Sequence, residues 1–177
     1  MTPAALLLDA GNTLVFLDTE AVAAVATAEG ACVTAAGLRA AEGAAKRRYE
    51  AALSAGASHE RGWDLFFESL LAEAGVDAAR SEGLLAALRA AHRELNLWRR
   101  VPDGLLEALS RARAAGLRLG VVSNSEGRLQ ELFERVGLAG AFEVVIDSAH
   151  EGVRKPEPEI FHRALQRLGL PPRRALY

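Results

Sequence analysis

Several features that anchor or cross-link proteins are scarce in this chain. Cysteine occurs once, at Cys32, so no disulfide can form within the chain, and no group of Cys and His residues has the spacing of a zinc site. The apolar stretches at residues 21–28 and 30–38 are separated by Glu29 and are shorter than the ~20 residues that cross a bilayer. The uncharged residues 1–3 lack the basic start of a secretory signal. We therefore expect a cytoplasmic protein without a membrane-spanning helix.

Positive charge comes almost entirely from arginine, because lysine stands only at positions 46 and 155. The 21 Lys and Arg residues are balanced by 23 Asp and Glu residues, for a net charge of −2, so the chain lacks the basic excess of a nucleic-acid-binding protein. Apolar residues, by contrast, are plentiful. They make up 50% of the 177 residues, and a chain of this length buries roughly 70% of its surface on folding. We expect a folded protein without a nucleic-acid partner.

Strand and helix patterns alternate in two parts of the sequence. Residues 4–8 form a continuous apolar run that ends in a polar turn, which is typical of a strand buried on both faces of a parallel sheet. Similar patterns predict strands at 117–122 and 142–146 and the start of another at 175–177, with helices at 103–115, 128–136 and 158–168. This alternation predicts an α/β fold with a doubly wound, Rossmann-like parallel sheet, whose ligands bind at the carboxyl ends of the strands.

The segment between these two parts has a different character. From residue 18 to about residue 96 the chain consists of Ala-, Leu-, Arg- and Glu-rich stretches broken by glycines, without a strand pattern. We expect an all-helical cap at residues 17–96, inserted into a core made of residues 1–16 and 97–177. A cap of this kind closes over the strand ends, excludes water and selects the substrate, so specificity is expected to lie in it.

The polar residues that follow the predicted strands carry the functional signal. Asp9 follows the first strand, Ser123 and Asn124 follow the second, and Lys155 lies in the loop beyond the third. Since the carboxyl ends of parallel strands meet at one edge of a sheet, we expect these side chains to converge. A carboxylate can attack phosphorus or carbon when a cation and hydrogen-bond donors hold the substrate. Lys155 would supply the cation, and Ser123 with the N–H groups that start the 128–136 helix would suit an anion such as phosphate.

Each of these residues also has a simpler structural explanation. An aspartate at a strand end, such as Asp9, often only forms a turn. Ser123 and Glu126 have the S-x-x-E spacing of a capping box, in which the serine caps the helix that follows. Lys155, which precedes a proline, would be an ordinary solvated lysine. The order of the pieces, each after its own strand, favours the functional interpretation.

Three motifs in this order resemble those of the haloacid dehalogenase superfamily of hydrolases, in the branch whose helical cap follows the first strand. They are LLLDAGNTLVF at residues 6–16, VVSNS at 121–125 and GVRKPEPEIF at 152–161. The resemblance covers essentially the whole chain. It implies a hydrolase, most often a phosphatase that acts on a small phosphate monoester through an aspartyl-phosphate intermediate. The implied partner is a small phosphorylated or otherwise anionic metabolite.

The resemblance also implies roles for individual residues. Asp9 would be the nucleophile, Ser123 and Asn124 would bind the transferred group, and Lys155 would steady its charge. The loop residues after the nucleophile would contact the substrate, namely Gly11, Asn12 and Thr13. The carbonyl of Gly11 would join Asp9 in holding Mg²⁺, an ion that prefers oxygen ligands.

One departure from the family concerns the acid–base residue. Phosphatases of the family carry a second aspartate two positions after the nucleophile, where this chain has Gly11. General acid–base catalysis is commonly worth about 10²–10⁴ in rate, so a phosphatase without it should be slow. Asp18 and Glu20 are close in sequence, but we expect them to form the acidic first turn of the cap helix. Dehalogenase and phosphonate-cleaving branches also lack this aspartate, so cleavage of a carbon–halogen or carbon–phosphorus bond is the alternative.

A second departure concerns the metal site. The family's fourth motif would follow the strand at 175–177 and would complete the Mg²⁺ site with further acids. We expect this chain to be cut short before the fourth motif, and Mg²⁺ to bind weakly to the ligands that remain. A binding module or inactive fragment that keeps the fold without catalysis is a further alternative.

Overall fold

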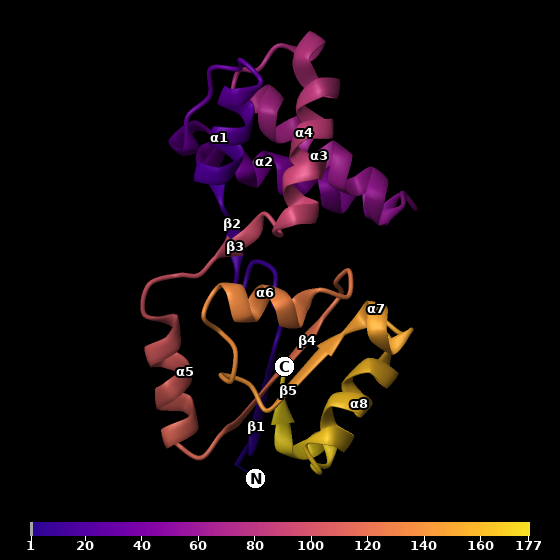
Figure 1. Ribbon diagram of the computed structural model, residues 1–177. Coiled ribbons are helices and arrows are strands. Elements are labelled where there is room, and N and C mark those ends of the chain that lie inside the picture. The colour runs from indigo at the N-terminus through magenta and orange to yellow at the C-terminus, as the bar shows by residue number, and fades with distance from the viewer. Residues whose placement is uncertain (1) are drawn as a thin grey trace. The chain divides into compact units, whose positions relative to one another are not determined.

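The computed structural model describes residues 2–177, which fold into two compact units (Figure 1). One unit runs to Leu17 and resumes from Trp98 to Tyr177, and the other is Asp18–Leu97. No helix within residues 2–177 is long and apolar enough to cross a membrane.

The first unit is built on a sheet of four parallel strands. They are β1 (Ala5–Leu8), β4 (Arg118–Ser123), β5 (Val144–Asp147) and β6 (Ala175–Leu176), in the order β5-β4-β1-β6. Leu8 lies opposite Val121, and Ser123 lies opposite Asp147, so β1, β4 and β5 end at the same edge. The predicted α/β fold with a parallel sheet is confirmed. The strand predicted at 142–146 begins later, at Val144.

Helices connect these strands. They are α5 (Leu105–Ala114), α6 (Leu129–Arg135), the short α7 (Ser148–Glu151) and α8 (Pro158–Arg167), followed by the 3₁₀ turn η2 (Pro172–Arg174). Because crossovers between parallel strands are right-handed, and the chain moves from β1 to β4 to β5 before returning to β6, α8 covers the opposite face from α5 and α6. The sheet is therefore doubly wound.

The packing of α8 shows why this face is stable. The helix begins with a proline at its first position and ends before Gly169, whose φ of 62° suits a glycine. Its buried residues Ile160 and Leu165 belong to one cluster with Leu7 of β1. Each large side chain buried in this way contributes roughly 1.5–3 kcal/mol. Gly120 of β4 permits the close packing, since an added Cβ would lie 2.8 Å from a methyl carbon of Leu7.

Two short strands that the sequence patterns did not predict stand where the chain leaves and re-enters this unit. β2 (Phe16–Leu17) and β3 (Trp98–Arg100) pair in antiparallel fashion and form a separate two-stranded sheet. The guanidinium of Arg100 lies 5.3 Å from the centroid of the Phe16 ring, so a cation–π contact adds to the pairing.

The second unit is helical. It consists of α1 (Thr19–Ala28), α2 (Ala35–Ser54), α3 (His59–Glu73), the 3₁₀ turn η1 (Ala78–Arg80) and α4 (Ser81–Glu94). Side-chain oxygens of Asp18, Thr34 and Ser58 cap the first three helices by accepting backbone N–H groups. Asp18 and Glu20 thus occupy the cap and first turn of α1, as expected from the sequence. The core includes Phe67, which is fully buried.

Candidate active site

Asp9 and Lys155 meet at the carboxyl edge of the parallel sheet. Asp9 directly follows β1, and Lys155 lies in the loop between α7 and α8. The Nζ atom of Lys155 is 2.7 Å from Oδ1 of Asp9, and the lysine side chain is only 15% exposed. The same Oδ1 accepts the backbone N–H of Ala10 at 2.7 Å. Two groups of the protein thus hold one carboxylate oxygen, in a side chain that is 38% exposed.

The backbone of Lys155 is fixed by Asn124. The N–H of Lys155 donates to Oδ1 of Asn124 at 2.7 Å, and Nδ2 of Asn124 donates to the carbonyl of Lys155 at 3.0 Å. Both ends of the Asn124 amide are therefore used within the protein. Within the protein this side chain contacts the loop that carries the lysine, and its contact with a ligand stays a prediction.

Ser123 is the last residue of β4 and is 4% exposed. The alternative explanation of Ser123, a capping box with Glu126, is wrong. The helix α6 begins at Leu129, too far along the chain for Ser123 to cap it, and its N-cap residue makes no side-chain capping bond. The serine therefore ends a strand beside the Asp9 loop rather than beginning a helix.

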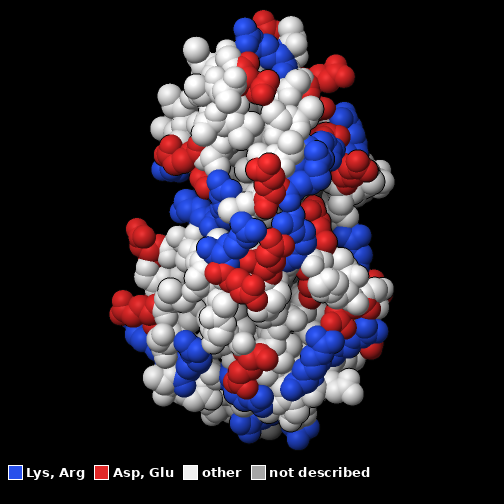
Figure 2. All heavy atoms as spheres, in the orientation of Figure 1, with Lys and Arg blue, Asp and Glu red and all other residues white. Residues whose placement is uncertain are grey.

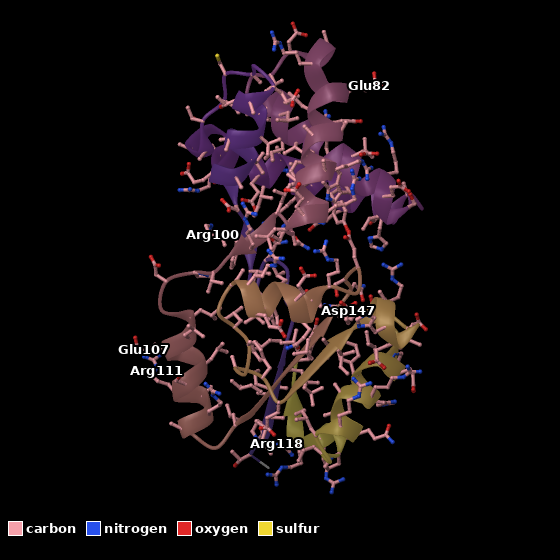
Figure 3. All side chains as sticks on the ribbon, viewed as in Figure 1. Glu82, Arg100, Glu107, Arg111, Arg118 and Asp147 are labelled. Atoms are coloured by element: carbon pink, nitrogen blue, oxygen red, sulfur yellow. The ribbon has the colours of Figure 1, made fainter. Side chains whose placement is uncertain are left out.

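Asp147, rather than Ser123, caps the start of α6. Its carboxylate accepts three backbone N–H groups: those of Gly127 at 3.1 Å and Ala149 at 3.0 Å on Oδ1, and that of Leu129 at 3.2 Å on Oδ2. The side chain is 5% exposed and lies at the end of β5, whereas Arg118 marks the opposite end of the sheet (Figure 3). The first N–H group of α6, that of Leu129, is thus bonded to a carboxylate of the protein itself.

Asp147 was not predicted from the sequence as a residue of this site, although its position in the sequence could have identified it. It ends a buried apolar strand in the same way as Asp9, and Ser148 follows it. The hydroxyl of Ser148 accepts the N–H of Ser125 at 3.1 Å. Together the two side chains fasten the loop after β4, which carries Asn124, to the end of β5.

The loop after Asp9 is a tight turn. The carbonyl of Ala10 accepts the N–H groups of Leu14 at 2.9 Å and Val15 at 3.0 Å, and Asn12 adopts a φ of 59°, which asparagine tolerates better than most residues. Asn12 and Thr13 are exposed. They lie beside Asp9 in the chain, at the edge where ligands bind in sheets of this type.

Gly11 in this turn has room for a side chain. No atom lies within 4 Å of the position that its Cβ would take, and its φ is outside the left-handed region. Neither backbone conformation nor packing therefore requires a glycine here.

Two oxygen donors beside this turn suit Mg²⁺, namely the carboxylate of Asp9 and the carbonyl of Gly11. Within residues 2–177 there is no group of three or more His, Cys, Asp or Glu residues that could hold a metal. Mg²⁺ commonly binds through one or two carboxylates and keeps several waters or substrate oxygens, so this donor pair fits a largely hydrated ion.

The start of the loop that bears Lys155 is tied to α8 by charge. Glu151, at the end of α7, accepts hydrogen bonds from Arg163 at 3.2 Å and from Arg167 at 2.7 Å. Burial raises the pKa of Glu151, but the hydrogen bonds from Arg167 and Arg163 outweigh it, so this pKa lies below its ordinary value. Elsewhere acidic and basic side chains are interspersed on the visible face (Figure 2).

The family model of haloacid dehalogenase-like hydrolases matches residues 3–177. The chain is 32% identical over 123 residues to glyceraldehyde 3-phosphate phosphatase of Methanopyrus kandleri, an alignment that covers 69% of this chain and 51% of that protein. It is 40% identical over 80 residues to haloacid dehalogenase-like hydrolase domain-containing protein 3 of Xenopus laevis, covering 45% of this chain and 32% of that protein. The matched segments thus span about half or less of these relatives.

Solved structures share the fold. YfnB of Bacillus subtilis, described as a HAD-hydrolase bound to magnesium, superposes with a TM-score of 0.66 at 22% identity, covering 94% of this chain and 73% of that one. Sequence identity this low supports a common fold and no more.

Proposed function

Because the chain belongs to the family of haloacid dehalogenase-like hydrolases, we propose that it is a phosphatase that hydrolyses a small phosphate monoester through Asp9. The observation that carries this proposal is the 2.7 Å contact between Lys155 and Asp9 at the carboxyl edge of the sheet. A carboxylate and an ammonium group at this place can together attack a phosphorus atom and balance the charge on its oxygens.

In the first step Asp9 acts as the nucleophile. Lys155 and the N–H of Ala10 hold Oδ1, and we assign the attack to Oδ2. A bond forms between Oδ2 and phosphorus, and the bond between phosphorus and the ester oxygen breaks. The ester oxygen leaves with the electron pair and takes a proton from solvent water to become the alcohol, since Gly11 supplies no acid. In the second step a water molecule attacks phosphorus and gives up a proton to solvent, the bond to Oδ2 breaks, and inorganic phosphate is released with the Asp9 carboxylate restored.

Other side chains of the site bind the phosphoryl group or position Lys155. We assign the Ser123 hydroxyl and the exposed loop residues Asn12 and Thr13 to the phosphoryl oxygens. Asn124 is assigned to positioning, because its amide already holds the backbone of Lys155. Asp9 and the Gly11 carbonyl would hold Mg²⁺, which when bound neutralises negative charge on the phosphoryl group.

The helical unit is assigned to substrate selection. We propose that the segment predicted as a cap, residues 17–96, excludes water from the site and chooses the alcohol part of the ester. The phosphatase named among the relatives supports a small phosphorylated metabolite as the substrate class.

A direct assay tests this function. With p-nitrophenyl phosphate and Mg²⁺ the protein is expected to release inorganic phosphate, and removal of the ion with EDTA is expected to suppress the release. Metal-independent release of chloride from 2-chloropropionate without phosphatase activity would support a dehalogenase instead. No turnover of phosphates, phosphonates or haloacids, with stabilisation by phosphate in a thermal melt, would support a binding module.

Gly11 gives a gain-of-function prediction. Gly11→Asp is expected to raise kcat for an alkyl phosphate by about 10- to 100-fold, because it supplies a proton donor for the leaving alcohol where the structure has open space. Gly11→Asn is the matched control, since it has the same size but cannot act as an acid. Equal rates for the two variants would show that proton donation does not limit the reaction.

A further inference from the structure

Tyr177 contacts the candidate catalytic lysine, although none of the sequence motifs includes it. The Nζ atom of Lys155 donates to the hydroxyl of Tyr177 at 2.8 Å and lies 5.5 Å from the centroid of its ring. The ammonium group is therefore held from two sides, by the carboxylate of Asp9 at 2.7 Å and by the tyrosine.

The Tyr177 ring is itself held in place. It packs against Phe161 of α8, with 4.8 Å between ring centroids and an angle of 70° between the planes. This edge-to-face geometry is the favourable one for an aromatic pair. Tyr177 directly follows β6, which pairs with β1, so the strands that lead to Tyr177 and to Asp9 are neighbours.

Lysine has four rotatable side-chain bonds and loses much entropy when it is fixed. A single contact with Asp9 leaves the direction of its remaining N–H groups unset. A second acceptor, in the form of a hydroxyl on a ring that is itself packed, fixes the side chain before substrate arrives. Because the lysine side chain is already ordered, the entropy cost of fixing it is not added to the barrier of the reaction.

We propose that Tyr177 is a positioning residue that holds the ammonium group of Lys155 against Asp9. This rests on the proposed function only for its catalytic consequence, because the contact can be tested without substrate. The variants Tyr177→Phe and Tyr177→Leu separate the two parts of the contact. The first removes the hydroxyl and keeps the ring, and the second removes both.

Because lysine is scarce, the contact between Lys155 and Tyr177 can be followed by NMR spectroscopy. Protein labelled only at lysine, with ¹³C at Cε and ¹⁵N at Nζ, has two labelled sites, Lys155 and Lys46. Tyr177→Phe is expected to move the Lys155 resonances and Tyr177→Leu to move them further, since ring and hydroxyl are both lost. Lys46, which pairs with Glu42 in the helical unit, is the internal reference and is expected to stay in place. Unmoved Lys155 resonances in both variants would overturn the proposal.

Steady-state kinetics test whether the contact between Tyr177 and Lys155 affects catalysis. Tyr177→Phe is expected to lower kcat for p-nitrophenyl phosphate about 3- to 10-fold with KM unchanged, the size of one hydrogen bond to a partly exposed group. Tyr177 is 61% exposed, so the change is not expected to unfold the protein. Tyr49→Phe, at the one other tyrosine in the sequence, is the matched control and is expected to leave kcat unchanged.

A double-mutant cycle distinguishes positioning from a general structural effect. In the Lys155→Met background, Tyr177→Phe is expected to cause no further loss, because the group on which it acts is gone. A further loss in that background, or an unchanged kcat in the single variant, would overturn the proposal. If the wild-type protein has no phosphatase activity, the proposed function fails, while the lysine resonances still decide whether Tyr177 holds Lys155.

Discussion

Replacing Asp9 by asparagine is expected to lower kcat for phosphate release by a factor of about 10⁴ or more, the range seen when an enzyme loses its nucleophile. The amide has nearly the same shape but carries no charge and is a poor nucleophile, so no aspartyl intermediate can form. It also leaves the ammonium group of Lys155, 2.7 Å away in the wild type, without its carboxylate partner. Steady-state release of p-nitrophenol with Mg²⁺ present measures the loss.

A matched control distinguishes loss of the nucleophile from loss of the folded structure. Asp103→Asn makes the same change at an exposed position before α5 and is expected to retain wild-type activity. Both variants should show cooperative thermal unfolding. An Asp9→Asn variant that keeps most of its activity would mean that another residue attacks the substrate.

Replacing Lys155 by methionine is expected to lower kcat about 10²- to 10³-fold, the cost of removing one group that stabilises charge in a transition state. Methionine preserves much of the length of the side chain, so the loss reports on the ammonium group. Lys155→Arg is not expected to restore the rate. A planar guanidinium cannot replace a compact ammonium group between the Asp9 carboxylate and the Tyr177 hydroxyl.

Lys46 provides the control for this pair of variants. It is the one other lysine of the sequence and forms a salt bridge to Glu42 at 2.8 Å within α2. Lys46→Met and Lys46→Arg are both expected to leave kcat unchanged. Full activity in Lys155→Arg would show that any positive charge serves at this position. It would contradict the claim that the compact shape of the ammonium group is required.

The meeting of Asp9 with Lys155 could be predicted from the sequence for a simple reason. Buried parallel strands are nearly uniform in hydrophobicity, so their ends are marked by the first polar residue, and parallel strands end at the same edge. The position of Asp9 after β1 and the loop of Lys155 beyond β5 follow from that pattern alone. A role for each residue in catalysis remains a proposal.

The alternative explanation of Ser123 as a helix cap was wrong because it rested on local spacing alone. The S-x-x-E spacing of a capping box depends on where a helix begins, and α6 begins at Leu129 rather than directly after the serine. The acceptor that caps this helix comes from Asp147, 18 residues away from Leu129 in sequence. Local patterns do not report an acceptor that the fold brings in from another strand.

The contacts that fix Lys155 could not be predicted from sequence patterns for the same reason. Asn124 and Tyr177 lie 31 and 22 residues from Lys155 and reach it only because β4 and β6 both flank β1. The strands β2 and β3 are two and three residues long, too short for an alternating pattern to be recognised. The order of the strands and the packing of the loops, rather than hydrophobic periodicity, decide these features.

Chemical trapping of the intermediate tests the central claim, that Asp9 attacks the substrate, most directly. The protein is mixed with p-nitrophenyl phosphate and Mg²⁺, quenched during turnover with sodium borohydride, digested and sequenced by mass spectrometry. Borohydride reduces an acyl phosphate to an alcohol, so homoserine is expected at position 9 and at no other aspartate, and only when substrate is present. Phosphate release during turnover with an unmodified Asp9, or with the reduced residue elsewhere in the chain, would contradict the assignment.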